Sequence, residues 1–361
     1  MATFDVVFEG GGAKGVALAG GVAALHKHGH SLGRLIGTSA GAITATNLAV
    51  GYTAEEIFGG ALERTPDGKS VYAGFADVPK LTDDEMKATG IFKVLSGIPL
   101  PMTARAEERL DLMLMHVLSH APHFASLISL FELGGLFRGD GFLNWMNGCL
   151  ARKGFENATL GELHKKTGKD LSVVATDTTD RRLLVFNHRT APDVPVVWAV
   201  RMSMSIPFYW QEVRWNGSWG KYLGREMTGR TIVDGGVVSN FPLFLLTDSS
   251  DEEVVRLMGP QQGAGNPAIG FYLDPTLDVL GAEAKPVPDH TGPTRARIDA
   301  LLDTLMSARD NATFDAHRER VVKLPVRGYG TTDFDMPEPR ARSLFDAAHA
   351  ATQEWLARSP V

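Results

Sequence analysis

Two glycine-rich turns within the first 41 residues constrain this chain more than any other feature. Each turn follows a short apolar run, Asp5 to Phe8 in the first case and Arg34 to Gly37 in the second. Each is followed by a segment with the composition of a helix, Val16 to His28 and Ala40 to Val50. Short runs rich in valine, isoleucine and phenylalanine are typical of buried parallel strands. Two strand–turn–helix units in succession predict an α/β fold with a mostly parallel sheet covered on both faces.

Further elements are predicted along the rest of the chain. Thr53 and Thr159 each precede a glutamate by three residues, a capping-box pattern that begins a helix. The apolar stretch from Phe124 to Phe137 has two interpretations, a helix packed on the core or a lid or acyl-chain pocket. The remaining patterns predict helices at 104–119, 141–150, 194–204, 295–308 and 339–358, strands at 171–175, 183–187 and 268–273, and a hairpin region at 213–232.

The whole chain of 361 residues is interpreted as one domain, because it shows no internal repeat and no clear boundary. Residues 64–138 are expected to form a helical insertion or lid, and residues 339–358 a C-terminal helix. The net charge of −6 gives no reason to expect nucleic-acid binding. One cysteine allows no internal disulfide, and no signal peptide or membrane-spanning run is apparent. We therefore expect a cytoplasmic protein whose contact with membranes, if any, is peripheral.

The second turn, Gly37 to Gly41, matches the pattern G-x-S-x-G with Ser39 at its centre. A serine at a tight strand-to-helix turn points outward, and the turn requires small neighbours. The helix N-terminus that follows also favours a developing negative charge. Gly37 and Gly41 are thus predicted to form a nucleophile elbow for Ser39. The alternative is a glycine-rich turn with an incidental serine.

The first turn, Gly10 to Gly15, has two competing interpretations. It fits the dinucleotide pattern G-x-G-x-x-G, which would make the chain an NAD(P)-binding protein. That pattern expects an acidic residue about 20 positions on, yet no Asp or Glu occurs between Glu9 and Glu55. The alternative is an oxyanion hole, in which successive glycines turn their N–H groups toward a substrate carbonyl. Lys14 either adds a positive charge there or is a solvated lysine at the start of a helix.

A serine nucleophile also requires a base. None of the histidines after Ser39 has a sequence context that singles it out. Asp234, in contrast, ends the apolar run 231–233 and precedes two glycines. This places a carboxylate at a strand end with room for close approach, although Asp-Gly is also a common turn.

Together these motifs resemble those of the patatin-like phospholipase family. The matching segments are residues 9–15, 37–41, 203–207 and 234–236, in family order, with further similarity at 237–242 and 331–335. The resemblance covers about residues 4–336. Two departures are Glu9 in place of the usual aspartate and Met202 in place of alanine.

The resemblance implies a three-layer α/β/α patatin-like fold and a lipid acyl hydrolase of the phospholipase A or lysophospholipase type. It implies a Ser-Asp dyad in which Ser39 attacks the ester and Asp234 takes its proton. Gly11 and Gly12, helped by Gly10 and Lys14, would hold the oxyanion. The mechanism requires no metal or other cofactor. The expected partner is a phospholipid or other acyl-ester lipid, with transient contact to a membrane surface. A second alternative is a patatin-fold module that docks on membranes with little catalysis.

Overall fold

The structure is a computed structural model that describes residues 1–66, 68–75, 122–260, 265–281, 316–331 and 333–358, with isolated positions between 77 and 92. The helices predicted at 104–119 and 295–308 lie outside these residues, as does much of the predicted insertion at 64–138.

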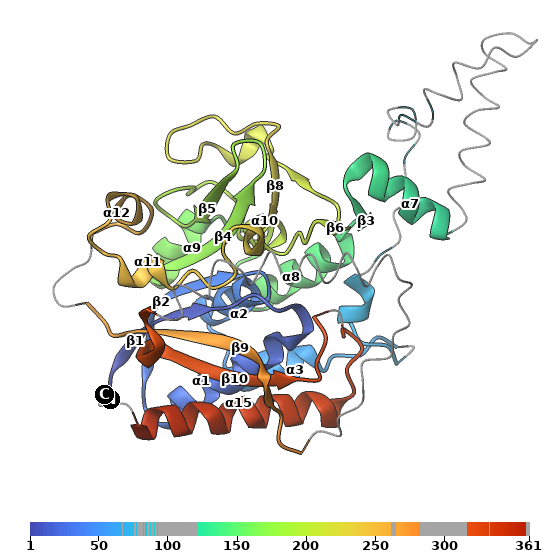
Figure 1. The fold of residues 1–361 in the computed structure, drawn as a ribbon. Coiled ribbons are helices and arrows are strands. Elements are labelled where there is room, and N and C mark those ends of the chain that lie inside the picture. Colours follow the sequence, from blue (N-terminus) through green and yellow to red (C-terminus); the bar gives the residue numbers. More distant parts are fainter. Residues whose placement is uncertain are drawn as a thin grey trace, which may run out of the picture.

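A mixed, mostly parallel sheet of eight strands forms the centre of the described structure (Figure 1). Strands β10, β9, β1, β2 and β4 lie side by side in that order and run parallel, whereas β5, β7 and β8 pair antiparallel. A separate parallel pair joins β3 to β6. The strand bounds are β1 Thr3–Phe8, β2 Ser31–Thr38, β3 Gly135–Phe137, β4 Leu171–Asp177, β5 Arg182–Phe186, β6 Phe208–Trp210, β7 Val213–Arg214, β8 Thr231–Asp234, β9 Ala268–Asp278 and β10 Val321–Arg327.

Strand β4 brings the ends of two other strands together. Its residue Val174 pairs with Thr38 at the end of β2, and the next residue, Ala175, pairs with Asp234 at the end of β8. Strands β2 and β8 flank β4 on its two sides, and because β2 runs parallel and β8 antiparallel to β4, their carboxyl ends reach the same level of β4. The turns that follow β2 and β8 are therefore neighbours in space.

Helices cover the sheet, and those predicted from capping boxes begin where expected. The side chains of Thr53 and Thr159 each accept a hydrogen bond from the backbone N–H of the glutamate three residues later. The side chain of that glutamate in turn accepts the backbone N–H of the threonine. The α-helices are α1 Val16–Lys27, α2 Ala40–Ala49, α3 Ala54–Ala61, α7 Pro122–Leu133, α8 Asp140–Arg152, α9 Leu160–Thr167, α10 Val196–Ser203, α11 Phe244–Thr247, α12 Glu252–Met258 and α15 Glu338–Arg358. The short 3-10 helices are η1 Gly12–Gly15, η2 Tyr72–Phe75, η3 Gly217–Trp219, η4 Gly235–Val237 and η5 Arg318–Arg320.

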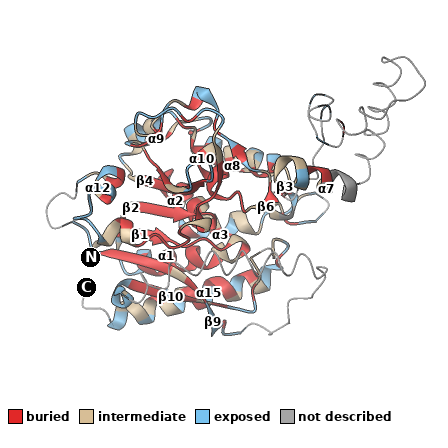
Figure 2. Cartoon of the chain, turned by 45° about the horizontal axis from the view of Figure 1, so that its top comes forward, coloured by how far each residue is buried: buried red, intermediate tan, exposed pale blue. Residues whose placement is uncertain are grey.

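Neighbouring residues of β9 show how both faces of the sheet are covered. Gly270 leaves room for the Phe241 ring on one face, and Phe271 contacts Gly21 of α1 on the other. Side chains of adjacent strand residues point to opposite faces, so these contacts define the two outer layers. Helix α15 packs on α1 and β10, and the sheet between the layers is buried (Figure 2). The predicted α/β fold with a central, mostly parallel sheet is confirmed.

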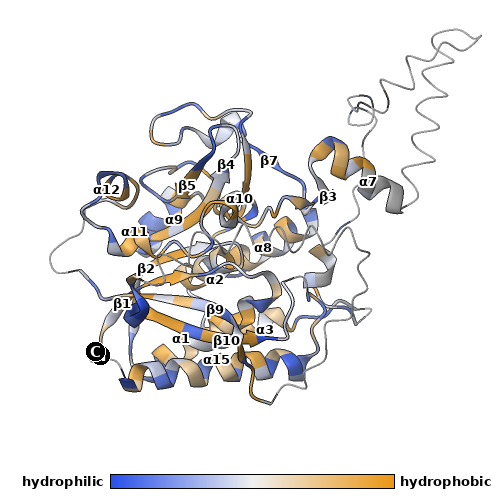
Figure 3. Cartoon of the chain, in the orientation of Figure 1, coloured by the Kyte–Doolittle hydropathy of each residue, from blue (hydrophilic) through white to orange (hydrophobic). Residues whose placement is uncertain are grey.

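Strands β3 and β10 and helix α12 are among the elements that were not predicted from the sequence. Strand β10 lies at the edge of the sheet and contains Lys323 and Pro325, residues that are disfavoured in central strands but tolerated at edges. Helix α12 has only seven residues, too few for a clear periodic signal. The apolar stretch 124–137 divides into α7 and the short strand β3. Figure 3 shows that the described part of α7 is largely hydrophobic.

Candidate active site

Ser39 occupies a strained turn between β2 and α2. Its backbone has φ 52° and ψ −119°, and a positive φ is uncommon for a residue with a side chain. Its N–H donates to Ser203 Oγ at 2.9 Å, and the residue is 3% exposed. Ser39 is also the N-cap of α2, where the helix dipole favours negative charge. The turn thus has the geometry predicted for a nucleophile elbow.

The two flanking glycines are required by close backbone contacts. A Cβ on Gly37 would lie 2.2 Å from the Gly41 carbonyl oxygen, and one on Gly41 would lie 2.1 Å from the Phe8 carbonyl oxygen. Real Cβ atoms do not approach backbone oxygens this closely. The G-x-S-x-G spacing therefore allows α2 to begin directly against the end of β1.

Asp234 lies at the end of β8 and is completely buried. Oδ1 accepts the Gly236 N–H at 2.7 Å, and the Asp234 N–H donates to the Ser205 carbonyl at 2.9 Å. Among the described residues, no donor meets the geometry of a hydrogen bond to the second oxygen, Oδ2. Burial raises the pKa of Asp234 to about 7, against smaller lowering effects of the Gly236 N–H and the Ser39 side chain. The structure therefore brings Ser39 beside a carboxyl group that titrates near neutral pH.

The first glycine turn lies against the same place. A Cβ on Gly10 would be 3.1 Å from Ser39 Cβ, and one on Gly15 would be 3.0 Å from Ala40 Cβ. The Gly10 N–H donates to the Asn240 carbonyl at 3.2 Å, so it is already satisfied. Within the described residues, the N–H groups of Gly11 and Gly12 donate to no protein acceptor. These two donors are therefore available for a substrate oxygen.

Lys14 and Gly12 complete this turn. Lys14 donates its backbone N–H to the Gly11 carbonyl, and its aliphatic stem passes close to Gly11. Gly12 has φ +55°, and a Cβ there would lie 2.1 Å from the carbonyl oxygen of Thr331. Only glycine fits this position, because the positive φ disfavours a side chain and the Thr331 carbonyl leaves no space for a Cβ atom.

Glu9 and Asn240 hold the first turn in place. Glu9 is 7% exposed, and its two oxygens accept the Asn240 Nδ2 and the Leu273 N–H. Asn240 Nδ2 also donates to the Gly10 carbonyl at 2.9 Å. Glu9, which replaces the usual family aspartate, thus links β1, β9 and the segment after η4. With glutamate at this position, the carboxylate still accepts hydrogen bonds from both Asn240 and Leu273.

We expect Glu9→Gln to lower the free energy of unfolding by about 1–3 kcal/mol, because one side-chain oxygen becomes an NH₂ that faces a donor in a buried site. Urea unfolding measures this change. Glu319→Gln, at a side chain that is 70% exposed, is the control and should stay within about 0.5 kcal/mol of the wild type. Equal effects of the two substitutions would contradict the linking role of Glu9.

Two residues of the site have roles that the motifs did not reveal. Ser203 accepts the Ser39 N–H and donates to the Val174 carbonyl at 2.6 Å, which ties the elbow to β4. Arg201 is 2% exposed and donates to Ser205 Oγ and to the carbonyls of Arg138 and Gln211. Burial lowers the pKa of Arg201 to about 10, so it remains charged at neutral pH. A lone arginine in the apolar segment 194–204 was the available signal.

Other chemistries find little support at this site. In the described ranges no histidine hydrogen-bonds to Ser39 or Asp234, and no cluster of three or more His, Cys, Asp or Glu side chains is arranged to hold a metal ion. Strand β2 ends at Thr38 and is followed by Ser39, where a dinucleotide fold would place an acidic residue for the ribose. The oxyanion interpretation of the first turn therefore fits the surroundings better than the dinucleotide interpretation.

The family model described as patatin-like phospholipase matches residues 6–247. The uncharacterized protein YqhO of Bacillus subtilis is 29% identical over 359 residues, covering 98% of this chain and 97% of YqhO. The probable lipid hydrolase 463L of Invertebrate iridescent virus 6 is 24% identical over 239 residues, covering 66% of this chain and 61% of the viral protein.

Solved structures similar to the chain include two bacterial proteins. VipD from Legionella pneumophila has a TM-score of 0.44 and 19% identity, covering 98% of this chain and 66% of VipD. ExoU, in its complex with SpcU from the type III secretion system of Pseudomonas aeruginosa, has a TM-score of 0.43 and 16% identity, covering 99% of this chain and 52% of the matched chain. The chain thus spans just under two thirds of one of these proteins and about half of the other.

Proposed function

Because the chain belongs to the patatin-like phospholipase family, we propose that it is a lipid acyl hydrolase in which Ser39 is the nucleophile and Asp234 the base. The observation that carries this proposal is the meeting of the ends of β2 and β8 on β4, which sets the strained serine beside a buried carboxyl group. The substrates that fit are phospholipids or lysophospholipids, cleaved as in a phospholipase A.

The reaction begins when Ser39 Oγ attacks the carbonyl carbon of the acyl ester. Its proton passes to the Asp234 carboxylate, where Oδ2 has no full hydrogen bond among the described residues. The tetrahedral intermediate then collapses, and the leaving alcohol takes the proton back from Asp234. Water attacks the acyl-enzyme with Asp234 again as base, releasing the fatty acid and restoring Ser39.

The oxyanion of each intermediate lies within reach of the first glycine turn. Gly11 and Gly12 supply backbone N–H groups that are not used elsewhere in the described structure. Preorganised donors of this kind contribute on the order of 3 kcal/mol each to transition-state stabilisation. The N-terminus of α2, which begins directly after Ser39, adds a favourable dipole. Lys14, whose aliphatic stem passes close to Gly11, would add charge at the edge of this hole, and Gly10 would contribute mainly by holding the turn.

The proposed contact region for a lipid surface lies beside the pair β3–β6 and contains two exposed aromatic side chains. Phe208 is 52% exposed and has φ 66°, and Phe131 in the last turn of α7 is 78% exposed. The two segments are joined, because the Phe208 N–H donates to the Gly134 carbonyl at 3.2 Å. Behind them, the Tyr209 ring packs against Phe137 and Phe334. Exposed aromatic side chains of this kind insert favourably into the interface of a bilayer. In the described ranges, no helix has the length and apolar character needed to cross a membrane.

We expect the double variant Phe131→Ser/Phe208→Ser to lose about tenfold in fatty-acid release from phospholipid vesicles, because burying two aromatic rings at an interface is worth a few kcal/mol at most. Hydrolysis of a dissolved short-chain ester should change less than twofold, since that substrate needs no surface. Parallel assays on the two substrates measure the difference. An equal loss on both would assign these residues to the site itself, and no loss on vesicles would remove them from the contact region.

The experiment that tests the proposed function is the analysis of lipids released by the purified protein. Phospholipids and lysophospholipids of several headgroups are presented as vesicles and micelles, and the free fatty acids are identified by mass spectrometry. Ester-dependent release of fatty acid supports the proposal and defines the acyl position. The absence of release from every acyl ester, with the protein shown to be folded, would contradict it.

A further inference from the structure

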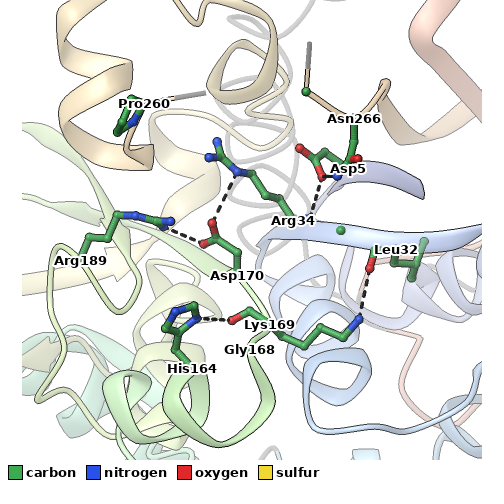
Figure 4. Close-up of a pocket in the computed structure, with 12 residues that line it drawn as sticks. Asp5, Leu32, Arg34, His164, Gly168, Lys169, Asp170, Arg189, Pro260 and Asn266 are labelled. Carbon is green, nitrogen blue, oxygen red and sulfur yellow. Dashed lines mark hydrogen bonds and ion pairs between the residues drawn. The ribbon is translucent and has the colours of Figure 1, made fainter. Parts of the chain in front are cut away.

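A cavity of about 830 Å³ lies at the end of the sheet opposite to Ser39. Figure 4 shows the residues that line it. Its walls come from the beginnings of the parallel strands, including Asp5 of β1, Arg34 of β2 and Asp170 directly before β4. Arg34 precedes Ser39 by five residues on β2, about 16 Å in an extended strand. A volume of this size is that of a typical small-molecule site. The cavity is therefore separate from the candidate active site.

Asp170 holds two guanidinium groups at this cavity. Its Oδ1 accepts Arg189 Nη1 at 2.9 Å, and its Oδ2 lies 3.5 Å from Arg34 Nε. The two arginines approach Asp170 from different elements, as Figure 4 shows. One carboxylate thus fixes two cations in a common orientation.

The arginines keep donors that the protein does not use. Arg34 meets Asp170 through Nε alone, and its two terminal nitrogens point away from that carboxylate (Figure 4). Among the described residues no side-chain or backbone acceptor binds these nitrogens, and Arg189 uses only Nη1. Lys169 adds a third cation, with Nζ 3.2 Å from the Leu32 carbonyl.

The acidic groups of the cavity are already engaged. Asp5 Oδ1 accepts the Arg34 N–H and Asn266 Nδ2, both at 2.8 Å. Asp170 is divided between the two arginines, and the cavity wall has three cationic side chains against these two carboxylates. The side chains of Arg34 and Arg189 are 20% and 33% exposed, so their unused N–H groups are accessible to a ligand in the cavity.

The geometry points to a binding site for the phosphate group of a small, water-soluble phosphate ester. Planar guanidinium groups match the oxygens of phosphate two at a time, and the three cations of the wall exceed its two carboxylates by one positive charge. The concave wall has few apolar side chains, Leu32 and Pro260 among them, which suits a soluble ester better than a lipid surface. This inference is independent of the reaction at Ser39.

Isothermal titration calorimetry of the full chain with glycerol 3-phosphate and with inorganic phosphate, at constant ionic strength, tests the inference. We expect binding with a Kd below about 1 mM for the ester, unchanged in Ser39→Ala. Arg34→Gln should weaken binding at least about tenfold. Arg358→Gln, which removes the same charge from a side chain that is 80% exposed, should not change it.

A second variant keeps the test decisive if Arg34→Gln is poorly folded. Asp170→Asn removes the carboxylate that competes for both guanidinium groups, so binding should become at least threefold tighter. A purely structural network predicts lower stability without tighter binding. Failure of both phosphates to bind the wild type, unchanged binding in Arg34→Gln, or no tightening in Asp170→Asn would overturn the inference. If the protein cosediments with phosphatidic acid vesicles but does not bind the soluble ester, the phosphate group recognised is that of a lipid headgroup and not that of a soluble ester.

Discussion

Replacing Ser39 by alanine is expected to reduce ester hydrolysis about 10⁴-fold or more, because no acyl-enzyme can then form. The fold should persist, since the Ser39 N–H still donates to Ser203 and a methyl group is smaller than the hydroxymethyl group it replaces. Initial rates on a chromogenic ester and on phospholipid vesicles measure the loss.

The matched control for Ser39→Ala is Ser250→Ala, which removes a hydroxyl from an exposed residue before α12. It should retain wild-type rates. Turnover by Ser39→Ala within about tenfold of the wild type would exclude Ser39 as the nucleophile.

Asp234→Asn is expected to abolish activity by a similar factor and, at the same time, to stabilise the protein at alkaline pH. Asparagine is nearly isosteric and keeps an oxygen for the Gly236 N–H, but it cannot accept the Ser39 proton. The loss of activity is therefore attributed to the base. An unchanged rate in Asp234→Asn would exclude the dyad.

The effect on stability follows from the raised pKa of Asp234, about 7 in the folded protein against 3.8 as its ordinary value. Between these values the folded state binds more protons than the unfolded state, so the free energy of unfolding falls as pH rises. At pH 8 the wild type carries the full cost of a buried charge, and Asp234→Asn does not. With a difference of about three pKa units, the variant should be more stable there by on the order of 4 kcal/mol. The difference should shrink toward pH 5, as denaturant unfolding at the two pH values would show.

The same pKa sets the pH dependence of the wild-type rate. Because the ionised carboxylate is the base, kcat/KM should fall about tenfold per pH unit below about pH 7 and level off above it. A profile that is flat between pH 5 and 8 would contradict this role of Asp234.

Much of the fold could be predicted from local patterns, and the exceptions have physical causes. The strands that are buried on both faces, such as β1 and β4, appear in the sequence as short runs rich in apolar residues. Strand β10 does not, because an edge position tolerates Lys323 and Pro325. Helix α7 and strand β3 appeared as one apolar stretch, since the change of period at Gly134 occupies too few residues to be recognised.

The sequence motifs identified the chemical groups of the site, whereas the contacts between these groups depend on the fold. Ser39 and the flanking glycines could be predicted, because a tight turn restricts residue size. The satisfied N–H of Gly10 could not, since its acceptor on Asn240 is more than two hundred residues away. The buried arginine Arg201 and the cavity around Arg34, Asp170 and Arg189 are likewise assembled from distant segments. Such constellations depend on strand order, which local sequence patterns do not specify.

Covalent labelling by a fluorophosphonate, with the modified residue located by peptide mass spectrometry, tests the central claim most directly. We expect one adduct, on Ser39, that is absent from Ser39→Ala and forms much more slowly in Asp234→Asn. Modification at another residue, or undiminished labelling of Ser39→Ala, would contradict it.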